Sequence, residues 1–192
     1  MSAAAQPTVL IVPGLRDHIA DHWQTHLANG LPKVACVPRM RNERDKLDCA
    51  AWVSMLDRSL ASIAGPVILV AHSGGVVMVA HWAARHRRPI QAALLATPPD
   101  FDAPLPAGYP SIEVLRENGW LPVPRARLPF PSIVAASEND PLCTLERAHE
   151  QARDWGSAVV NVGRVGHLNP SAGYGPWPRA HELIADLAAL DR

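Results

Sequence analysis

Short apolar runs recur along the chain, and each is bordered by glycine or proline. Six such runs, of four or five residues, lie at 8–12, 34–37, 67–71, 92–96, 132–136 and 158–162. They lack the alternation of apolar and polar residues that is typical of a strand with one solvent-exposed face. We therefore expect six strands that are buried on both faces of a sheet.

The segments between these runs have the apolar spacing of amphipathic helices. Asp48 is a suitable N-cap for a helix in which Trp52, Leu56 and Leu60 share one face, and Gly65 marks its end. Further helices are predicted at 74–87, at 144–155 and from Pro178 onward. Strands that alternate with helices predict one α/β domain over residues 1–192, with a mostly parallel sheet and helices on both faces.

Two segments fall outside this alternation. Residues 1–7 predict a frayed tail. Residues 98–130 hold eight prolines and fit no regular element, apart from one short helix around 111–118. This proline-rich excursion is either a plain surface loop or a cap beside a functional site, since long excursions in compact domains are often functional.

Composition excludes several classes of protein. Lys and Arg together number 18, as do Asp and Glu, and 48% of the residues are hydrophobic. A disordered chain would be less apolar, and a nucleic-acid-binding protein would be more basic. No apolar run approaches the roughly 20 residues that span a bilayer. We therefore expect neither a nucleic-acid nor a membrane partner.

Cysteine usage and the N-terminus favour a cytoplasmic location. Cys36, Cys49 and Cys143 are odd in number and show no CxxC spacing, so they predict small buried or half-buried thiols rather than disulfides. The first eight residues contain no Lys or Arg and no apolar core, unlike a signal peptide.

One strand-to-helix junction has the composition of a nucleophile elbow. The run at 67–71 leads directly into His72-Ser73-Gly74-Gly75 and then into an apolar helical segment. A serine nucleophile must stand clear of the sheet on a strained turn, with small residues beside it so that strand and helix can approach. Ala71 occupies the first glycine position of the Gly-x-Ser-x-Gly pattern and adds only a methyl group. The junction predicts Ser73 as a nucleophile.

An activated serine needs a base and an acid, which follow it in the order acid, then histidine. Asp140 follows the run at 132–136, and Glu138 is the rival acid. His167 follows the last run, after a glycine-rich turn. We prefer Asp140, because one helix and one strand then separate it from His167. The backbone N–H groups of Leu15 and Gly74 are the candidates for the oxyanion hole.

Other candidate sites are weaker. His18, His22 and His26 are spaced by four residues, but no further ligand accompanies them, so we expect a half-wet helix face and no metal. No glycine-rich phosphate loop is present, and we expect no cofactor. Trp120, Tyr174 and Trp177 are candidates for the acyl pocket, with core or loop packing as the alternative.

The chain resembles the small serine hydrolases of α/β-hydrolase fold, a group that includes retinoblastoma-binding protein nine and the YdeN-like bacterial proteins. The resemblance covers nearly the whole chain. Its most specific blocks are Ala-His-Ser-Gly-Gly at 71–75, Asn-Asp-Pro at 139–141, Gly-His-Leu-Asn at 166–169 and Gly-Tyr-Gly-Pro-Trp-Pro at 173–178. His22-Trp23 after the opening Val-Pro-Gly-Leu also matches, although Pro13 stands where the family often has His.

This resemblance implies a compact core with a minimal cap and a Ser73–Asp140–His167 triad. It also implies esterase-like activity on small acyl substrates, with water as the acceptor. An acyltransferase or a thioesterase could use the same triad, and a binding protein could retain the fold without catalysis. The sequence leaves a protein partner open.

Overall fold

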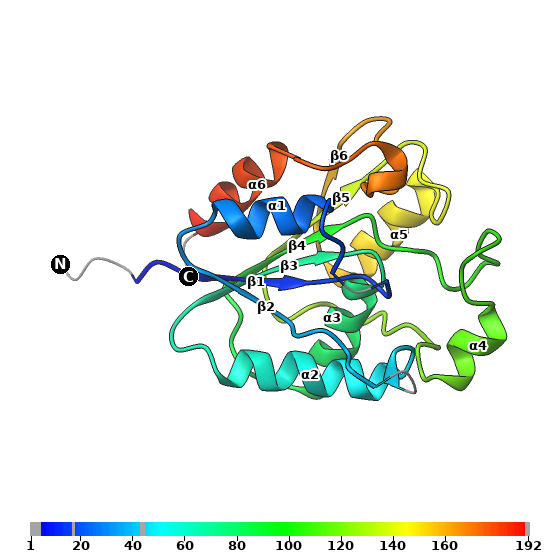
Figure 1. Cartoon of the computed structure of the whole chain (residues 1–192), viewed down its shortest axis with the longest axis horizontal. Helices are drawn as coiled ribbons and strands as arrows, with labels where there is room; N and C mark the ends of the chain where they lie inside the picture. The colour runs from blue at the N-terminus through cyan, green and yellow to red at the C-terminus, as the bar shows by residue number, and fades with distance from the viewer. Residues whose placement is uncertain (1–4, 17, 43–44, 191–192) are drawn as a thin grey trace.

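Six parallel strands form one sheet in the order β2-β1-β3-β4-β5-β6 (Figure 1). The computed structural model describes residues 5–16, 18–42 and 45–190. The strands are β1 (Thr8–Val12), β2 (Val34–Cys36), β3 (Val67–His72), β4 (Ala92–Ala96), β5 (Ser132–Ala136) and β6 (Ala158–Asn161). The expected α/β fold is confirmed, and each strand lies where an apolar run predicted it.

Helices accompany these strands, and several of them begin or end at residues that favour such positions. They are α1 (Trp23–Gly30), α2 (Cys49–Ala61), α3 (Gly74–Arg85), α4 (Ile112–Glu117), α5 (Leu145–Trp155), α6 (Arg179–Ala188) and the short 3₁₀ helix η2 (Pro170–Ala172). The side chains of Asp48, Ser111 and Thr144 each accept a backbone N–H at a helix start. Gly156 ends α5 in the left-handed conformation that favours glycine.

The two faces of the sheet bury separate apolar cores. Leu10 and Val12 point to the core shared with α2, α3 and α5, whereas Val9 and Ile11 point to the core shared with α1 and α6. This alternation is the period-two geometry of a strand. Figure 1 shows the resulting three layers, with α1 and α6 over one face and α2 and α3 over the other.

The strand order reverses between β1 and β3. From β1 the chain moves outward to the edge strand β2 and then returns to β3 on the other side of β1. The connections that follow β1 and β3 leave toward opposite faces, since α1 packs on one face and α3 on the other. Parallel sheets bind ligands in the crevice that opens at the carboxyl ends of such strands.

The proline-rich excursion connects β4 to β5 and contains α4. Figure 1 shows it beyond the carboxyl ends of the strands, to the side of the sheet. It contributes Phe101, Leu115, Trp120, Val123 and Phe130 to the core beneath α2 and α3. The excursion is therefore a packed part of the structure with a short helix, as expected around 111–118.

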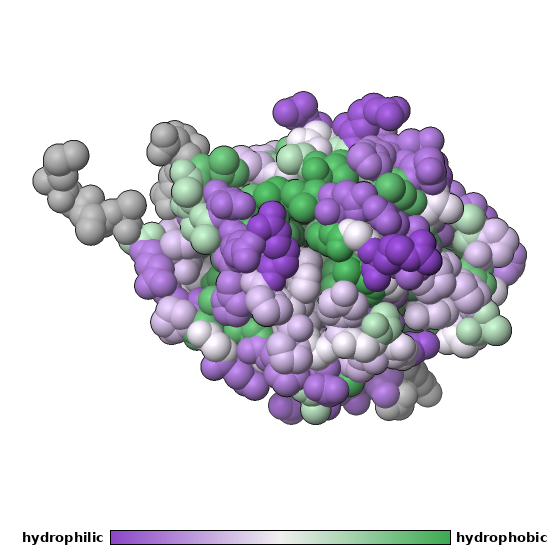
Figure 2. Space-filling model, turned by 90° about the horizontal axis from the view of Figure 1, so that it is seen from above, coloured by the Kyte–Doolittle hydropathy of each residue, from purple (hydrophilic) through white to green (hydrophobic). Residues whose placement is uncertain are grey.

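The surface above α1 and α6 is mostly hydrophilic, with smaller apolar areas between the hydrophilic side chains (Figure 2). Among the described residues, the large apolar side chains that are exposed are Ile19 and Leu190. Within residues 5–16, 18–42 and 45–190, no helix is both long and apolar enough to cross a membrane. Cys49 and Cys143 are buried free thiols, but Cys36 is exposed, contrary to expectation.

Candidate active site

Ser73 occupies a strained turn between the end of β3 and the start of α3. Its backbone has φ 54° and ψ −129°, a combination that non-glycine residues rarely adopt. The strain is tolerated because the strand before it and the helix after it are both buried. This is the geometry of a nucleophile elbow, in which the serine hydroxyl stands clear of the sheet.

The two glycines after Ser73 are required by close approach. A Cβ on Gly75 would lie 2.4 Å from the carbonyl oxygen of Pro13 and 2.7 Å from that of Val12. A Cβ on Gly74 would lie 2.6 Å from Cγ of Leu15. The start of α3 thus packs directly against the loop that follows β1, which brings that loop beside the nucleophile.

His167 lies between Ser73 and Asp140 and contacts both. Its Nε2 is 2.7 Å from Oγ of Ser73, and its Nδ1 is 2.8 and 3.0 Å from the two carboxylate oxygens of Asp140. The side chains of His167 and Asp140 are 4% and 3% exposed, so water does not compete for these bonds. Glu138, the rival acid, instead accepts a hydrogen bond from Nδ2 of Asn161.

Hydrogen bonds from backbone N–H groups to side chains fix the positions of the acid and the base. The N–H of Leu142 donates to Oδ1 of Asp140 at 2.9 Å. Oδ1 of Asn139 accepts the N–H of Gly166 at 2.8 Å, directly before His167. Asn139 therefore links the two loops that carry the acid and the base, a role that its position in the Asn-Asp-Pro block did not reveal.

Two further histidines lie next to His167. The ring of His72 is 5.0 Å from that of His167 and 4.5 Å from that of His22, measured between centroids. Nε2 of His72 donates to the carbonyl oxygen of His167 at 2.8 Å. His72 therefore holds the backbone of His167, the candidate base, in place.

Both of these histidines are kept neutral. Burial, followed by repulsion from His167 and His18, lowers the pKa of His22 to about 4. Burial also lowers the pKa of His72 well below its usual 6.5, with repulsion from His167 and His22 adding to the effect. Nδ1 of His22 accepts the N–H of Gln24 at 3.2 Å, which leaves the proton of its neutral ring on Nε2.

Gln24 joins the two strands that carry the site. Its side chain is buried, and Nε2 donates to the carbonyl oxygens of Val12 at 3.0 Å and Val70 at 2.9 Å. Val12 ends β1 just before the loop at 13–16, and Val70 precedes the elbow on β3. No sequence pattern marks this role, since the partners of Gln24 are backbone carbonyl oxygens.

The candidate oxyanion donors lie side by side next to Ser73. Gly74 is the first residue of α3, so its N–H has no acceptor within the helix. The backbone nitrogen of Leu15 is 3.4 Å from the position that a Cβ on Gly74 would take. These two backbone N–H groups are therefore the candidates for an oxyanion hole, which needs two such donors.

A cavity of about 350 Å³ opens over Ser73 and His167. Its lining combines the loop after β1, the excursion and the loops that carry the acid and the base. The apolar side chains among its lining residues are Leu15, Ile19, Leu47, Pro99, Phe101, Leu105, Pro110, Leu142 and Pro170. The cavity therefore presents mostly apolar surface around a polar reaction centre.

The sequence of this chain matches the family model for serine hydrolases over residues 9–186. The chain belongs to the serine hydrolase family. A YdeN-like hydrolase from Pectobacterium atrosepticum is 30% identical, with a TM-score of 0.79, over 95% of this chain and 91% of that one. As a member of this family the protein is a hydrolase, and its expected resemblance to the YdeN-like proteins is confirmed.

More distant solved structures share the fold of this serine hydrolase. The ydeN gene product of B. subtilis is 18% identical, with a TM-score of 0.74 over 96% of this chain and all of that one. Est1E of Butyrivibrio proteoclasticus is 13% identical, with a TM-score of 0.69 over 96% of this chain and 92% of that one. A search of curated proteins found no match.

The three aromatic candidates for the acyl pocket of this hydrolase do not line the cavity. Trp120 is fully buried, and its Nε1 donates to the carbonyl oxygen of Leu47. Trp177 packs edge-on against Trp23 at 4.9 Å, and Tyr174 packs in the same core. These side chains stabilise the layers beneath the site, and Phe101, Leu105 and Leu142 line the cavity in their place.

The three histidines at 18, 22 and 26 do not share a helical face, because α1 begins only at Trp23. His22 caps that helix, Nε2 of His18 contacts the carbonyl oxygen of Val37, and Nε2 of His26 contacts Asp21. Across the described residues, no group of three or more His, Cys, Asp or Glu side chains is arranged to hold a metal ion.

Proposed function

We propose that this protein hydrolyses small carboxylic esters through a Ser73–His167–Asp140 triad and an acyl-enzyme intermediate. The observation that carries the proposal is the position of His167, which is within hydrogen-bond distance of Oγ of Ser73 at one ring nitrogen and of Asp140 at the other. A serine hydroxyl becomes nucleophilic when a histidine base is oriented in this way by a buried carboxylate.

In the first half of the reaction, Oγ of Ser73 attacks the ester carbonyl carbon and its proton moves to Nε2 of His167. Asp140 stabilises the imidazolium that forms. The N–H groups of Leu15 and Gly74 donate to the oxyanion. The intermediate then collapses, the bond to the alcohol oxygen breaks, and His167 returns the proton to the departing alcohol.

In the second half, water replaces the alcohol. His167 takes a proton from water as its oxygen attacks the acyl carbon on Ser73. The second tetrahedral intermediate releases the carboxylic acid, and the proton on Nε2 returns to Oγ of Ser73. His72 remains neutral throughout and holds the backbone of His167 in place.

The cavity supports small apolar acyl groups as substrates. Its volume of about 350 Å³ lies at the lower end of the usual range for small-molecule sites, and most of its lining is apolar. Est1E, which shares the fold, has been solved with ferulic acid, a small carboxylic acid. This fold therefore accommodates a ligand of that size.

Labelling with a fluorophosphonate probe tests the proposal directly. Wild-type protein should be labelled on Ser73, and the Ser73→Ala variant should not be labelled. Ester hydrolysis should fall by roughly 10³-fold or more in that variant. Ser62→Ala, which removes an exposed hydroxyl after α2, is the matched control and should behave as wild type. Wild-type protein that is neither labelled nor active on esters would refute the proposal.

A further inference from the structure

We propose that Arg147 is a positioning residue that fixes the acyl-binding wall of the cavity through Asp100 and so determines acyl-chain preference. This inference rests on the proposed esterase function. Arg147 is not among the residues that line the cavity. It acts through the first residues of the excursion, which follow β4.

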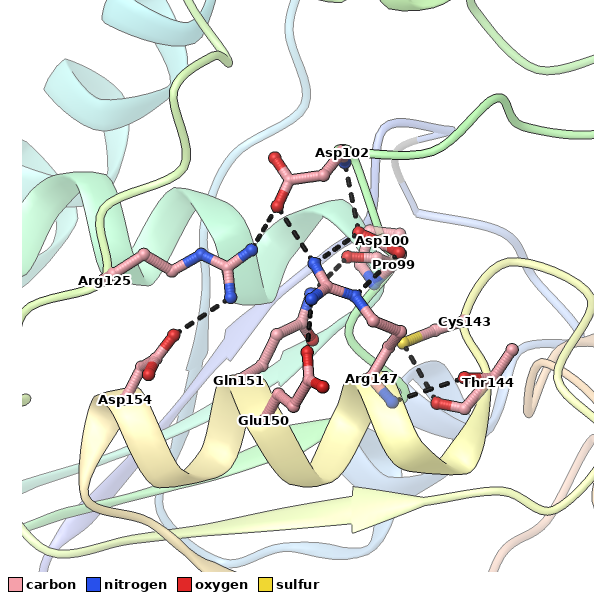
Figure 3. Close-up of polar contacts among 10 residues, drawn as sticks. All are labelled: Pro99, Asp100, Asp102, Arg125, Cys143, Thr144, Arg147, Glu150, Gln151 and Asp154. Carbon is pink, nitrogen blue, oxygen red and sulfur yellow. Dashed lines mark hydrogen bonds and ion pairs between the residues drawn. The ribbon is translucent and has the colours of Figure 1, made fainter.

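Asp100 stands between two residues of the cavity wall. Pro99 and Phe101 both line the cavity. The carboxylate of Asp100 points instead toward α5, where it faces the guanidinium of Arg147 (Figure 3). The side chain of Asp100 is 10% exposed, so its charge is largely withdrawn from water and depends on this partner.

Arg147 holds Asp100 with two hydrogen bonds. Nε donates to Oδ2 at 3.0 Å and Nη2 donates to Oδ1 at 3.2 Å. Bidentate pairs of this kind are stronger and more directional than ordinary surface ion pairs. Consistent with this geometry, the contact with Asp100 raises the pKa of Arg147 further above its already high value.

Arg147 and Asp100 form a clamp between α5 and the excursion, and further contacts extend this clamp along α5. Nη2 of Arg147 also donates to Asp102 at 3.0 Å. Arg125, near the other end of the excursion, pairs with Asp102 and with Asp154 of α5. Figure 3 shows these side chains above one face of α5. Both ends of the excursion are thus attached to the same helix.

The clamp also reaches the triad acid through the backbone. The N–H of Asp100 donates to the carbonyl oxygen of Leu142 at 2.8 Å. Leu142 lines the cavity, and its own N–H donates to Asp140. A displacement of Asp100 would therefore move two cavity walls, Phe101 and Leu142, before it affected the chemistry at Ser73.

This arrangement predicts an effect on acyl selectivity rather than a uniform loss of activity. On this inference a long acyl chain contacts the wall at Phe101 and Leu142, whereas an acetyl group does not extend so far. The test measures kcat and KM for p-nitrophenyl acetate and p-nitrophenyl hexanoate with wild type, Arg147→Gln, Asp100→Asn and the double variant. In each single variant the hexanoate-to-acetate ratio of kcat/KM should fall about fivefold, mostly through KM.

In the double variant the hexanoate-to-acetate ratio should fall no further than in either single variant, because both changes break the same pair. Arg147→Lys keeps the charge without the planar fork and should restore part of the ratio. Arg179→Gln removes an exposed arginine that pairs with Glu182 on α6, and is the matched control that should leave the ratio unchanged. Thermal unfolding of each variant shows whether the protein tested is folded.

Two results would overturn the inference: a ratio that stays constant or rises in folded Arg147→Gln, and losses in the two single variants that simply add. If kcat/KM falls by the same factor for both substrates, the ratio stays constant, and this outcome is therefore the first of these two results. These outcomes are distinct from failure of the proposed function, in which the wild-type protein itself shows no ester hydrolysis and no fluorophosphonate labelling.

Discussion

The floor and the roof of the cavity are held in place by different forces. The floor is formed where β1 and β3 end, and buried neutral groups fix it: Gln24 bridges two strand carbonyls, and His72 holds the backbone of His167. The roof is the excursion: its apolar side chains pack into the core, and its charged side chains attach it to α5. The side chains of Arg125 and Arg147 are each 31% exposed, so water and salt reach these contacts.

Because the floor and the roof are held differently, the chemistry of the site and its choice of substrate depend on different contacts. Buried neutral hydrogen bonds are insensitive to ionic strength, and losing one partner leaves an unsatisfied group behind. Partly exposed ion pairs are individually weaker and are screened by salt. The chemistry at Ser73 therefore depends on the rigid floor, and the choice of acyl group depends on the more adjustable roof.

The largest effect is expected when the floor loses Gln24. Gln24→Met keeps the length of the side chain but leaves the carbonyl oxygens of Val12 and Val70 without its donor. Stability should fall by about 3 kcal/mol, since each buried unsatisfied group costs about 1–3 kcal/mol. The loop at 13–16 and the elbow would no longer be joined, so kcat should fall about tenfold for acetate and hexanoate esters alike.

Denaturant unfolding and ester kinetics measure these changes. Gln91→Met is the matched control. Gln91 lies just before β4 and away from the site, and its Nε2 donates to a single carbonyl oxygen, that of Ala188. Its stability should change by less than about 1 kcal/mol. A Gln24→Met protein with wild-type kcat would show that the floor does not need this bridge.

A smaller effect is expected from pH, and it also acts on the floor. The pKa of His22 is about 4 in the folded protein and that of His72 is well below 6.5, so the unfolded chain binds more protons than the native state below pH 6.5. Stability is therefore fully present above 6.5 and is lost as pH falls toward the folded pKa values. Between pH 6.5 and 5.5 the two groups should cost about 2 kcal/mol.

Unfolding measured across this pH range provides the check. His22→Asn retains an acceptor for the N–H of Gln24 at the helix start but does not titrate. His22 and His72 together make stability depend on pH, and His22→Asn should reduce the slope that they produce by about half. A slope that is identical in wild type and His22→Asn would contradict a neutral His22 in the native state.

The smallest effect is expected when salt weakens the roof. Raising the NaCl concentration from about 0.05 M to about 1 M shortens the Debye length to about 3 Å and screens the pairs of Arg147 with Asp100 and Asp102. The hexanoate-to-acetate ratio of kcat/KM should fall about twofold in wild type relative to Arg147→Gln measured at the same salt. Equal salt dependence in both proteins would show that the roof is not held by charge.

The sequence predicted the strands and the grouping of Ser73, Asp140 and His167 for related reasons. Continuous apolar runs bordered by Gly or Pro have few alternatives to buried parallel strands. In such a sheet every carboxyl end lies at one edge, so polar residues that follow β3, β5 and β6 are brought together. The structure places these three side chains in contact, and their catalytic role is the proposal that labelling tests.

The cavity wall could not be predicted in the same way. Trp120, Tyr174 and Trp177 are large aromatic side chains outside the helices and strands. Whether such a side chain lines a cavity or fills a core depends on how its loop folds. The path of the excursion depends on Asp100 and Arg147, which are 47 residues apart and show no joint pattern. Gln24 was missed because its partners are backbone carbonyls, which no sequence pattern displays.

The place where the excursion enters the fold has a consequence for evolution and engineering. β4 and β5 pair directly, in a register from Ala93 opposite Ser132 to Ala96 opposite Ala135, so the connection between them does not set that register. The entropy of closing a loop rises only slowly with its length. Residues 103–110 lie between the points at which the excursion is attached to α5. They can therefore be lengthened, shortened or exchanged while the sheet and the elbow remain as they are. New substrate ranges can arise there through insertions and deletions, without repacking of the core.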